Sequence, residues 1–280
     1  MKNVLILGTG FIGQRLAQSL GDSYVVHNIR AEINDMNALT STLNDFMIDH
    51  KVDVIINAIG KTGKKNVDDC ETEQIATFYT NVVGLINLAT YCQMNSIYLI
   101  HIGSGCVYYD DKLETSLLRS EEDPAYPIST YSKSKYAGDL FLSTLQNVAS
   151  LRIRMPIDYI HSERNLLTKL IKYDKVLGIK NSITCIPDFI NVVKNFIENK
   201  HTGIYNVVNE GVISPAQIML MYSEKYPTHK FEIVHEMSQL GDLIKKNRSN
   251  CILSISKLNS IGIQMPHVRK SVAQIIEKYL

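Results

Sequence analysis

The chain opens Met1-Lys2-Asn3-Val4-Leu5-Ile6-Leu7-Gly8-Thr9-Gly10-Phe11-Ile12-Gly13, a short apolar run followed at once by three spaced glycines. The apolar run predicts a buried strand, and the residues from Phe11 onward predict a helix. Glycines at this spacing between a strand and a helix permit a tight turn, close approach of a pyrophosphate and close helix–strand packing. The helix N-terminus would offer its amide groups to the phosphates. We therefore predict a dinucleotide site containing Gly8, Gly10, Phe11, Ile12 and Gly13; the alternative is a glycine-rich turn that binds nothing.

Strands and helices alternate from this stretch to about residue 155. Further apolar strands are predicted at 23–27, 52–57, 97–102 and 150–154, and further helices at 36–48, 79–92 and 131–145. Short strands separated by helices predict parallel βαβ units with helices on both faces of a doubly wound sheet. The alternation weakens after Pro156, apart from one strand at 203–208. We predict an α/β fold with a Rossmann-type NADP-binding domain at 1–155, joined by the strand near 203–208, and a smaller substrate-binding lobe in 156–280.

The composition excludes several classes of protein. A formal net charge of +1 over 280 residues gives no electrostatic case for binding nucleic acid or an anionic membrane surface. No apolar run approaches the ~20 residues of a membrane span, and the N-terminal run is too short for a secretory signal. The five cysteines are odd in number and widely spaced, which argues against a disulfide framework or a metal site. We expect a cytoplasmic protein without a nucleic-acid or membrane partner.

The end of the second predicted strand bears on the choice between the two nicotinamide cofactors. An NAD site usually has an acidic residue there, which binds the ribose 2′-hydroxyl. Here the chain continues Asn28-Ile29-Arg30, and a guanidinium group suits the 2′-phosphate of NADPH. Glu32 lies close enough in sequence to leave NADH as the alternative. We predict NADPH.

Tyr131 and Lys135 lie one turn apart on a predicted helix and therefore share one face. A phenol titrates near ~10, and an adjacent ammonium group would lower that pKa, which makes the phenol a usable proton donor to a carbonyl oxygen. Alone, such a pair is common on exposed helices. Ser104, however, follows the strand at 97–102, at the sheet edge where open α/β sheets bind ligands. Ser104, Tyr131 and Lys135 together predict a site that reduces a ketone.

The order of these motifs resembles that of the extended short-chain dehydrogenase/reductases. The motifs are the glycine loop, Asn57-Ala58-x-Gly60, Asn81, Ser104, Tyr131 and Lys135. The resemblance implies that Asn57, Ala58 and Gly60 bind the cofactor, together with Tyr131 and Lys135. It also implies that Tyr131 protonates a C4 carbonyl oriented by Ser104. Lys135 would lower the pKa of Tyr131 and hold the nicotinamide ribose, and Asn81 would support a water of the proton relay.

Further segments extend the resemblance over residues 3 to 278. They are Thr62-Gly63-x-x-Asn66-Val67-Asp68-x-Cys70-Glu71, Gly105-Cys106, Leu151-Arg152-x-Arg154-Met155-Pro156-Ile157, Thr168-Lys169, Lys175-Val176, Asn181-Ser182-x-Thr184, Thr202-Gly203-Ile204-Tyr205-Asn206 and Arg248-Ser249-Asn250. This set resembles the 3,5-epimerase/4-reductase portion of plant rhamnose synthases and, more distantly, bacterial dTDP-4-dehydrorhamnose reductases.

That closer resemblance implies two acid/base groups, Cys106 and Lys169, on either side of a sugar ring. Inversion at C3 and C5 removes a proton on one face and delivers one to the other, and a thiol can do either. Cys106 is two residues after Ser104, so strand alternation predicts that both lie on the same side. The substrate-binding residues would be Asn66, Asp68, Ser104, Asn165 and Arg248, with Asn165 and Arg248 at the nucleotide diphosphate.

The implied activity is conversion of UDP-4-keto-6-deoxy-D-glucose to UDP-L-rhamnose with NADPH, by a homodimer formed through helices like those at 79–92 and 131–145. One alternative is a dTDP-4-dehydrorhamnose reductase without epimerase activity, since the sequence does not separate UDP from dTDP. Another is a non-catalytic regulatory subunit that binds NADP or a sugar nucleotide. An NAD-dependent epimerase or dehydratase is disfavoured because no Glu pair replaces Gly105-Cys106.

Overall fold

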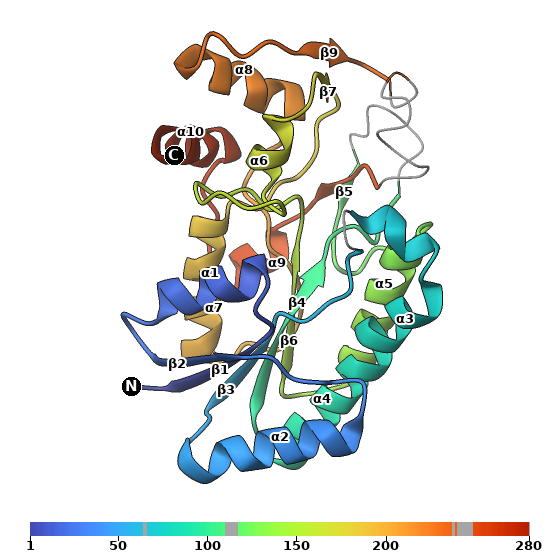
Figure 1. The fold of residues 1–280 in the computed structure, drawn as a ribbon, viewed down its shortest axis with the longest axis vertical. Coiled ribbons are helices and arrows are strands. Elements are labelled where there is room, and N and C mark those ends of the chain that lie inside the picture. Colours follow the sequence, from blue (N-terminus) through green and yellow to red (C-terminus); the bar gives the residue numbers. More distant parts are fainter. Residues whose placement is uncertain (64–65, 110–116, 237–238, 240–248, 280) are drawn as a thin grey trace. The chain divides into compact units, whose positions relative to one another are not determined.

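The computed structural model describes residues 1–63, 66–109, 117–236, 239 and 249–279 (Figure 1). The chain divides into two compact units. Unit 1 comprises Met1–Val107, Pro127–Arg152 and Val193–Tyr205, and unit 2 comprises Tyr108–Tyr126, Ile153–Val192 and Asn206–Leu280. The predicted division at residue 155 lies close to one of these boundaries. The prediction did not assign Tyr108–Tyr126 to unit 2. It also did not foresee that the chain returns to unit 1 at Val193, before the strand at 203.

Unit 1 is built on a six-stranded sheet with the order β2-β1-β3-β4-β6-β8 (Figure 1). The strands are β1 (Asn3–Leu7), β2 (Val25–Ile29), β3 (Val54–Asn57), β4 (Tyr98–Ser104), β6 (Val148–Ile153) and β8 (Gly203–Asn206). Strand β1 pairs in parallel with β2 on one side and β3 on the other, and β3 pairs in parallel with β4. The strand order therefore reverses between β1 and β3, where doubly wound sheets bind ligands at their carboxyl ends. The predicted fold class is confirmed.

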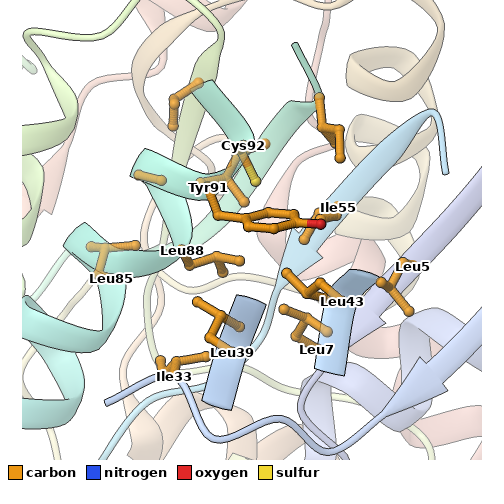
Figure 2. Packing of buried hydrophobic residues seen from close by; sticks show 14 of the residues in the cluster. Leu5, Leu7, Ile33, Leu39, Leu43, Ile55, Leu85, Leu88, Tyr91 and Cys92 are labelled. Atoms are coloured by element: carbon orange, nitrogen blue, oxygen red, sulfur yellow. The ribbon is translucent and has the colours of Figure 1, made fainter. Parts of the chain in front are cut away.

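The helices of unit 1 pack on this sheet through a shared apolar core. They are α1 (Phe11–Leu20), α2 (Met36–Asp49), α3 (Gln74–Phe78), α4 (Gly84–Met94) and α5 (Thr130–Leu142), with a 3₁₀ turn η1 (Val67–Glu71) and a π turn η2 (Tyr79–Val83). Figure 2 shows Tyr91 of α4 among leucines of α2 and α4 and residues of the sheet. The Tyr91 hydroxyl donates a hydrogen bond to Asn44 Oδ1 at 2.7 Å, which satisfies its polar end.

The predicted elements differ from the observed ones by a few residues at their ends, and two of these differences have a visible local cause or feature. Strand β2 begins at Val25, not at Ser23, because the amides of Ser23 and Tyr24 both donate to Leu20 O at 3.0 Å and continue the turn that ends α1. The helix predicted at 79–92 begins earlier, at Gln74, and contains the π turn η2. Such turns are rare and occur often at functional sites.

The helical run Gln74–Met94 is apolar and long enough to cross a membrane by length and composition alone. Within it, 44% of the most apolar window is buried inside the fold. Leu85, Leu88 and Cys92 belong to the core of unit 1. This placement is that of a core helix in a folded domain.

Most regular elements of unit 2 are helices. Its helices are α6 (Leu166–Leu170), α8 (Pro215–Lys225), α9 (Ser256–Ser260) and α10 (Val268–Lys278), and α7 (Ile186–Asn199) starts in unit 2 and ends in unit 1. Two short parallel pairs complete it, β5 (Leu118–Arg119) with β10 (Ile252–Leu253) and β7 (Lys175–Leu177) with β9 (Glu232–Val234). Apolar side chains of α6, α8 and α10 form its core, including Leu167, Ile218 and Val272.

Candidate functional site

The glycine loop between β1 and α1 has the shape of a phosphate cradle. Gly8 has φ +107°, and a Cβ there would lie 2.9 Å from the Ala58 carbonyl group. A Cβ on Gly13 would lie 1.9 Å from Gly8 O, so helix and loop are in close contact. A Cβ on Gly10 would meet no atom within 4 Å, and Gly10 is the N-cap of α1 without a side-chain cap. The helix N-terminus is therefore open, and the residues present fit a bound pyrophosphate.

Backbone hydrogen bonds hold this loop at the point where the strand order reverses. Gly8 N donates to Ile29 O, and Ala58 N donates to Leu7 O, each at 2.9 Å. Asn28 Nδ2 donates to Gly8 O at 2.9 Å. The ends of β1, β2 and β3 thus form one support, and the place of Ala58 beneath Gly8 supports its predicted part in the cofactor site.

Arg30 follows β2 and lies beside the glycine loop, because its Nε donates to Thr9 Oγ1 at 3.0 Å and its side chain is exposed. Glu32 is turned to its own loop, where Oε1 accepts from Asn34 N at 2.9 Å. A guanidinium group, and not a carboxylate, therefore lies next to the phosphate loop.

A buried chain of polar side chains runs from the end of β3 to α5. Asn57 Oδ1 accepts from Ile59 N at 3.0 Å, and Asn57 Nδ2 lies 3.1 Å from His101 Nδ1. His101 Nε2 lies 2.9 Å from Lys135 Nζ, which donates to Ile102 O at 3.0 Å. Burial lowers the pKa of Lys135 to about 8, against the opposing charge of Asp139. The Asn57 side chain is therefore used within the protein, and His101 is a site residue that the sequence reasoning missed.

Ser104 ends β4 and is hydrogen-bonded to the Tyr131 side chain. Burial raises the pKa of Tyr131 above its ordinary value, the nearby Cys106 raises it further, and the bond with Ser104 opposes them. The predicted lowering of this pKa by Lys135 is wrong for this structure, because burial dominates and Lys135 is bonded to His101 and Ile102. The phenol therefore remains protonated at neutral pH.

Cys106 lies beside Ser104, although the reason given for its placement was wrong. Strand β4 ends at Ser104, and Cys106 is in the turn that follows, so strand alternation does not apply. Instead Cys106 N donates to Ser104 Oγ at 3.2 Å, and the thiol interacts electrostatically with Tyr131. Cys106 is half-buried and is not part of a disulfide. Ser104, Cys106 and Tyr131 are therefore brought together.

Asn81 in the π turn η2 connects the backbone of Lys61 with Ser134 of α5 through side-chain hydrogen bonds. Its Oδ1 accepts from Lys61 N at 2.7 Å, and its Nδ2 donates to Lys61 O at 3.1 Å and to Ser134 Oγ at 2.9 Å. The side chain is 3% exposed. Both N–H groups of the amide are thus used to join the segment after Gly60 to α5, and support of a relay water stays a prediction.

Glu71 binds the start of α5, a role that its sequence motif did not predict. Glu71 Oε1 accepts from Thr130 N at 2.7 Å, and Oε2 accepts from Thr130 Oγ1 at 2.9 Å. A carboxylate at a helix N-terminus also interacts favourably with the helix dipole. The preceding Asn66 caps η1, since its Oδ1 accepts from Asp68 N at 2.7 Å. Substrate contacts of Asn66 and Asp68 stay predictions.

The remaining predicted residues belong to unit 2. Asn165 is fully buried and caps α6: its Oδ1 accepts from the amides of Asp158 and Leu167, and its Nδ2 donates to the carbonyls of Asp158 and Ile160. These four hydrogen bonds leave no polar group for a diphosphate, so that prediction is corrected. Lys169 is half-buried in the last turn of α6. Arg248 lies outside the described residues.

Comparison with known proteins shows the family of the chain. The family model described as RmlD substrate binding domain matches residues 1–280. An Arabidopsis thaliana protein, bifunctional dTDP-4-dehydrorhamnose 3,5-epimerase/dTDP-4-dehydrorhamnose reductase, is 31% identical over 98% of this chain and 92% of its own length.

Solved structures give the same result. The L780 UDP-rhamnose synthase from Acanthamoeba polyphaga mimivirus has a TM-score of 0.89 at 26% identity and 99% coverage of both chains. A dTDP-4-dehydrorhamnose reductase from Bacillus anthracis in complex with NADP has a TM-score of 0.84 at 20% identity and 100% coverage of both chains, which shows the shared fold. The chain thus belongs to the RmlD substrate-binding-domain family, and the relatives compared are reductases and epimerases of rhamnose synthesis.

Proposed function

We propose that the chain is a bifunctional 3,5-epimerase/4-ketoreductase that converts UDP-4-keto-6-deoxy-D-glucose to UDP-L-rhamnose with NADPH. The observation that carries the proposal is the position of Ser104. Its hydroxyl is bonded both to the side chain of Tyr131 and to the backbone of Cys106, at the carboxyl end of β4. A ketone oxygen placed against Ser104 and Tyr131 would have two donors and a thiol nearby.

Reduction requires a hydride at C4 and a proton at the C4 oxygen. NADPH supplies the hydride when it is bound. Tyr131 is the proton donor, because its raised pKa keeps the phenol in the acid form at neutral pH. Ser104 donates the second hydrogen bond to the same oxygen and fixes its orientation. The charge that develops on this oxygen is stabilised by preorganised donors in a buried site.

Epimerisation uses the same oxygen differently. Removal of the proton from C3 or C5 gives an enolate, whose oxygen accepts from Ser104 and Tyr131. The proposed acid/base pair consists of Cys106, which lies beside Ser104, and Lys169 of α6. One of them breaks a C–H bond and the other forms a C–H bond on the opposite face, so each inversion leaves the oxidation state unchanged. Asn66, Asp68 and Arg248 are the proposed substrate contacts that remain.

NADPH is the proposed cofactor because the glycine loop fits a pyrophosphate and Arg30 lies beside it. The similar reductase from Bacillus anthracis was solved with NADP. Glu32, the residue that would favour NADH, is bonded to the amide of Asn34. Lys135 is proposed to hold the nicotinamide ribose after it leaves its present partners.

We also propose a homodimer in the cytoplasm. Ile75 of α3, Tyr79 of η2 and Leu140 of α5 are exposed apolar side chains on helices of unit 1. Dimerisation through these helices would bury such side chains. None of the five cysteines, all of which the structure describes, is part of a disulfide, which suits a reducing compartment. Light scattering on the purified protein measures its mass, and a monomeric mass would contradict the dimer.

The second candidate function is reduction alone, with dTDP-4-dehydrorhamnose as substrate. The dTDP nucleotide is kept because the plant relative is named for dTDP sugars, whereas the viral structure is named for UDP-rhamnose. Reduction alone is kept because a relative from Aggregatibacter actinomycetemcomitans, 29% identical over 76% of this chain, is named dTDP-4-dehydrorhamnose reductase. The thiol of Cys106 beside Ser104 favours the bifunctional enzyme, because reduction itself needs no such group.

The test uses the purified chain, NADPH and UDP-4-keto-6-deoxy-D-glucose with no other protein added. We expect UDP-L-rhamnose and one NADPH oxidised per product. Tyr131→Phe should lower the rate of reduction by ~10²-fold or more, the usual contribution of a positioned acid. If product forms only after a separate epimerase is added, the chain has reductase activity without epimerase activity. Faster turnover of the dTDP substrate than of the UDP substrate would reverse the proposed nucleotide preference.

A further inference from the structure

His101 is a titratable residue in the middle of β4, a strand whose seven residues are all buried. It is 3% exposed and lies between Asn57 of β3 and Lys135 of α5. A neutral imidazole has one nitrogen that donates and one that accepts. The identity of each neighbour therefore decides which nitrogen of His101 carries the proton.

The direction of the hydrogen bonds is set at Asn57. The backbone amide of Ile59 can only donate, so the Asn57 atom 3.0 Å from it is the carbonyl oxygen. The other end of the side chain, the NH₂ group, then faces His101 Nδ1 at 3.1 Å. Nδ1 must accept from this group, which leaves the proton of the neutral ring on Nε2.

That tautomer determines the charge of Lys135. His101 Nε2–H points at Lys135 Nζ over 2.9 Å. Nζ can accept this hydrogen bond only as a neutral amine, because an ammonium nitrogen has no free electron pair. Neutral Lys135 still donates to Ile102 O at 3.0 Å. An ammonium group would instead place two donors against each other at His101. A doubly protonated His101 would likewise place its Nδ1–H donor against the NH₂ group of Asn57.

The charges around this group act in both directions. Burial lowers the pKa of Lys135 to about 8, and it lowers the pKa of His101 well below its ordinary value. Asp139 on α5 raises the pKa of Lys135, but Asp139 is itself paired with Arg152 of β6 at 2.7 Å. The other titratable residues on described elements packed against α5 are Asp68, Asp69, Cys70, Glu71, Tyr79, Tyr91, Cys92 and Tyr98.

We propose that His101 is a positioning residue that favours the neutral amine form of Lys135 in the cofactor-free protein, so that at alkaline pH NADPH binding takes up a proton from solvent onto Lys135. This inference rests on the proposed cofactor. A charged Lys135 loses its partner at His101 and is released toward the ribose hydroxyls.

The pH dependence follows from the pKa of Lys135 in the free protein, about 8. Because the bound state prefers the ammonium form, its pKa is higher in the complex. Well below pH 8 the amine is already charged and little proton is taken up. Above pH 8 uptake approaches one proton per NADPH, and the dissociation constant rises by up to tenfold per pH unit.

The first test is ¹⁵N NMR of His101 in the protein without cofactor at pH 9, where the His101→Gln variant identifies its signals. We expect an unprotonated Nδ1 and a protonated Nε2. A protonated Nδ1 would overturn the inference. This measurement needs neither substrate nor cofactor, so it is decided separately from the proposed function.

The second test is calorimetry of NADPH binding in two buffers that differ in protonation enthalpy, at pH 6.5 and pH 9. We expect uptake near zero at pH 6.5 and near one proton at pH 9. Binding with no proton uptake at pH 9 would refute the inference and leave the cofactor proposal intact. No binding at all would refute the cofactor proposal, and the NMR result would still decide the tautomer.

Asn57→Asp is the matched variant, because it keeps the size and the bond to Ile59 but offers His101 an acceptor in place of a donor. We expect the proton of His101 to move to Nδ1, so that Nε2 accepts from a charged Lys135. Uptake at pH 9 should then fall by at least half. His161→Gln, at an exposed histidine of unit 2, should leave both readouts unchanged. An unchanged His101 tautomer in Asn57→Asp would contradict the argument.

Discussion

Two glycines of one loop should respond in opposite ways to the same added methyl group. Gly10 has φ −81°, which any residue adopts, and a Cβ there meets no atom within 4 Å. Gly10→Ala should therefore fold normally, with a loss of less than ~1 kcal/mol from the poorer N-cap. Its methyl group would instead occupy the space in which the pyrophosphate is proposed to lie. We expect NADPH affinity to fall by at least about tenfold, or ~1.4 kcal/mol.

Gly13→Ala is the control for the same loop. Its Cβ would lie 1.9 Å from Gly8 O, a backbone atom that can move only with the loop. Overpacking of this kind costs ~3 kcal/mol, and the better helix propensity of Ala returns ~1 kcal/mol. The expected net loss of folding free energy is ~2 kcal/mol.

The assay pairs urea denaturation with fluorescence titration of NADPH for each variant. Gly10→Ala should separate binding from stability, and Gly13→Ala should lose stability. If Gly10→Ala binds NADPH as tightly as the parent protein, the pyrophosphate does not lie at the N-terminus of α1, and the cofactor placement is refuted.

Three further substitutions test separate parts of the site. Arg30→Ala should weaken NADPH binding by ~10-fold or more and change NADH binding little, because the lost contact is to the 2′-phosphate; equal losses for both would place Arg30 elsewhere. Glu71→Gln should lower the free energy of unfolding by ~1–2 kcal/mol, because it weakens the bonds to Thr130. It should also reduce kcat more than NADPH affinity, and an unchanged kcat would show that α5 does not need the Glu71 carboxylate. Asn165→Ala should cost ~2–4 kcal/mol of stability in denaturation, since the carbonyls of Asp158 and Ile160 lose their donor and α6 loses its cap; normal stability with weakened UDP binding would restore its predicted role.

The sheet and its ligand edge were predictable because short apolar strands and the glycine loop are local signals. The exception was β2, whose start depends on how α1 ends, with two amides donating to Leu20 O. The excursion of 108–126 into unit 2 carries no local signal, since it is defined by long-range packing.

The pairing of Ser104 with Tyr131 was predictable from their motifs, and the structure joins the two side chains by a hydrogen bond, while their catalytic roles stay predictions. His101 was missed because its role depends on neighbours from β3 and α5 that only the fold brings together. A histidine within an otherwise apolar buried strand was the one available signal. Asn165 was misassigned because a buried helix cap and a diphosphate ligand use the same amide, and the sequence does not show which partners are near.

The most direct measurement of the central claim is isotope incorporation during turnover in D₂O with NADPH, by the parent protein and by Cys106→Ala. The parent protein should yield UDP-L-rhamnose labelled at both C3 and C5. Cys106→Ala should bind NADPH nearly as tightly and incorporate no label at either carbon. Full labelling at C3 and C5 by Cys106→Ala, or an unlabelled product from the parent protein, would contradict the account.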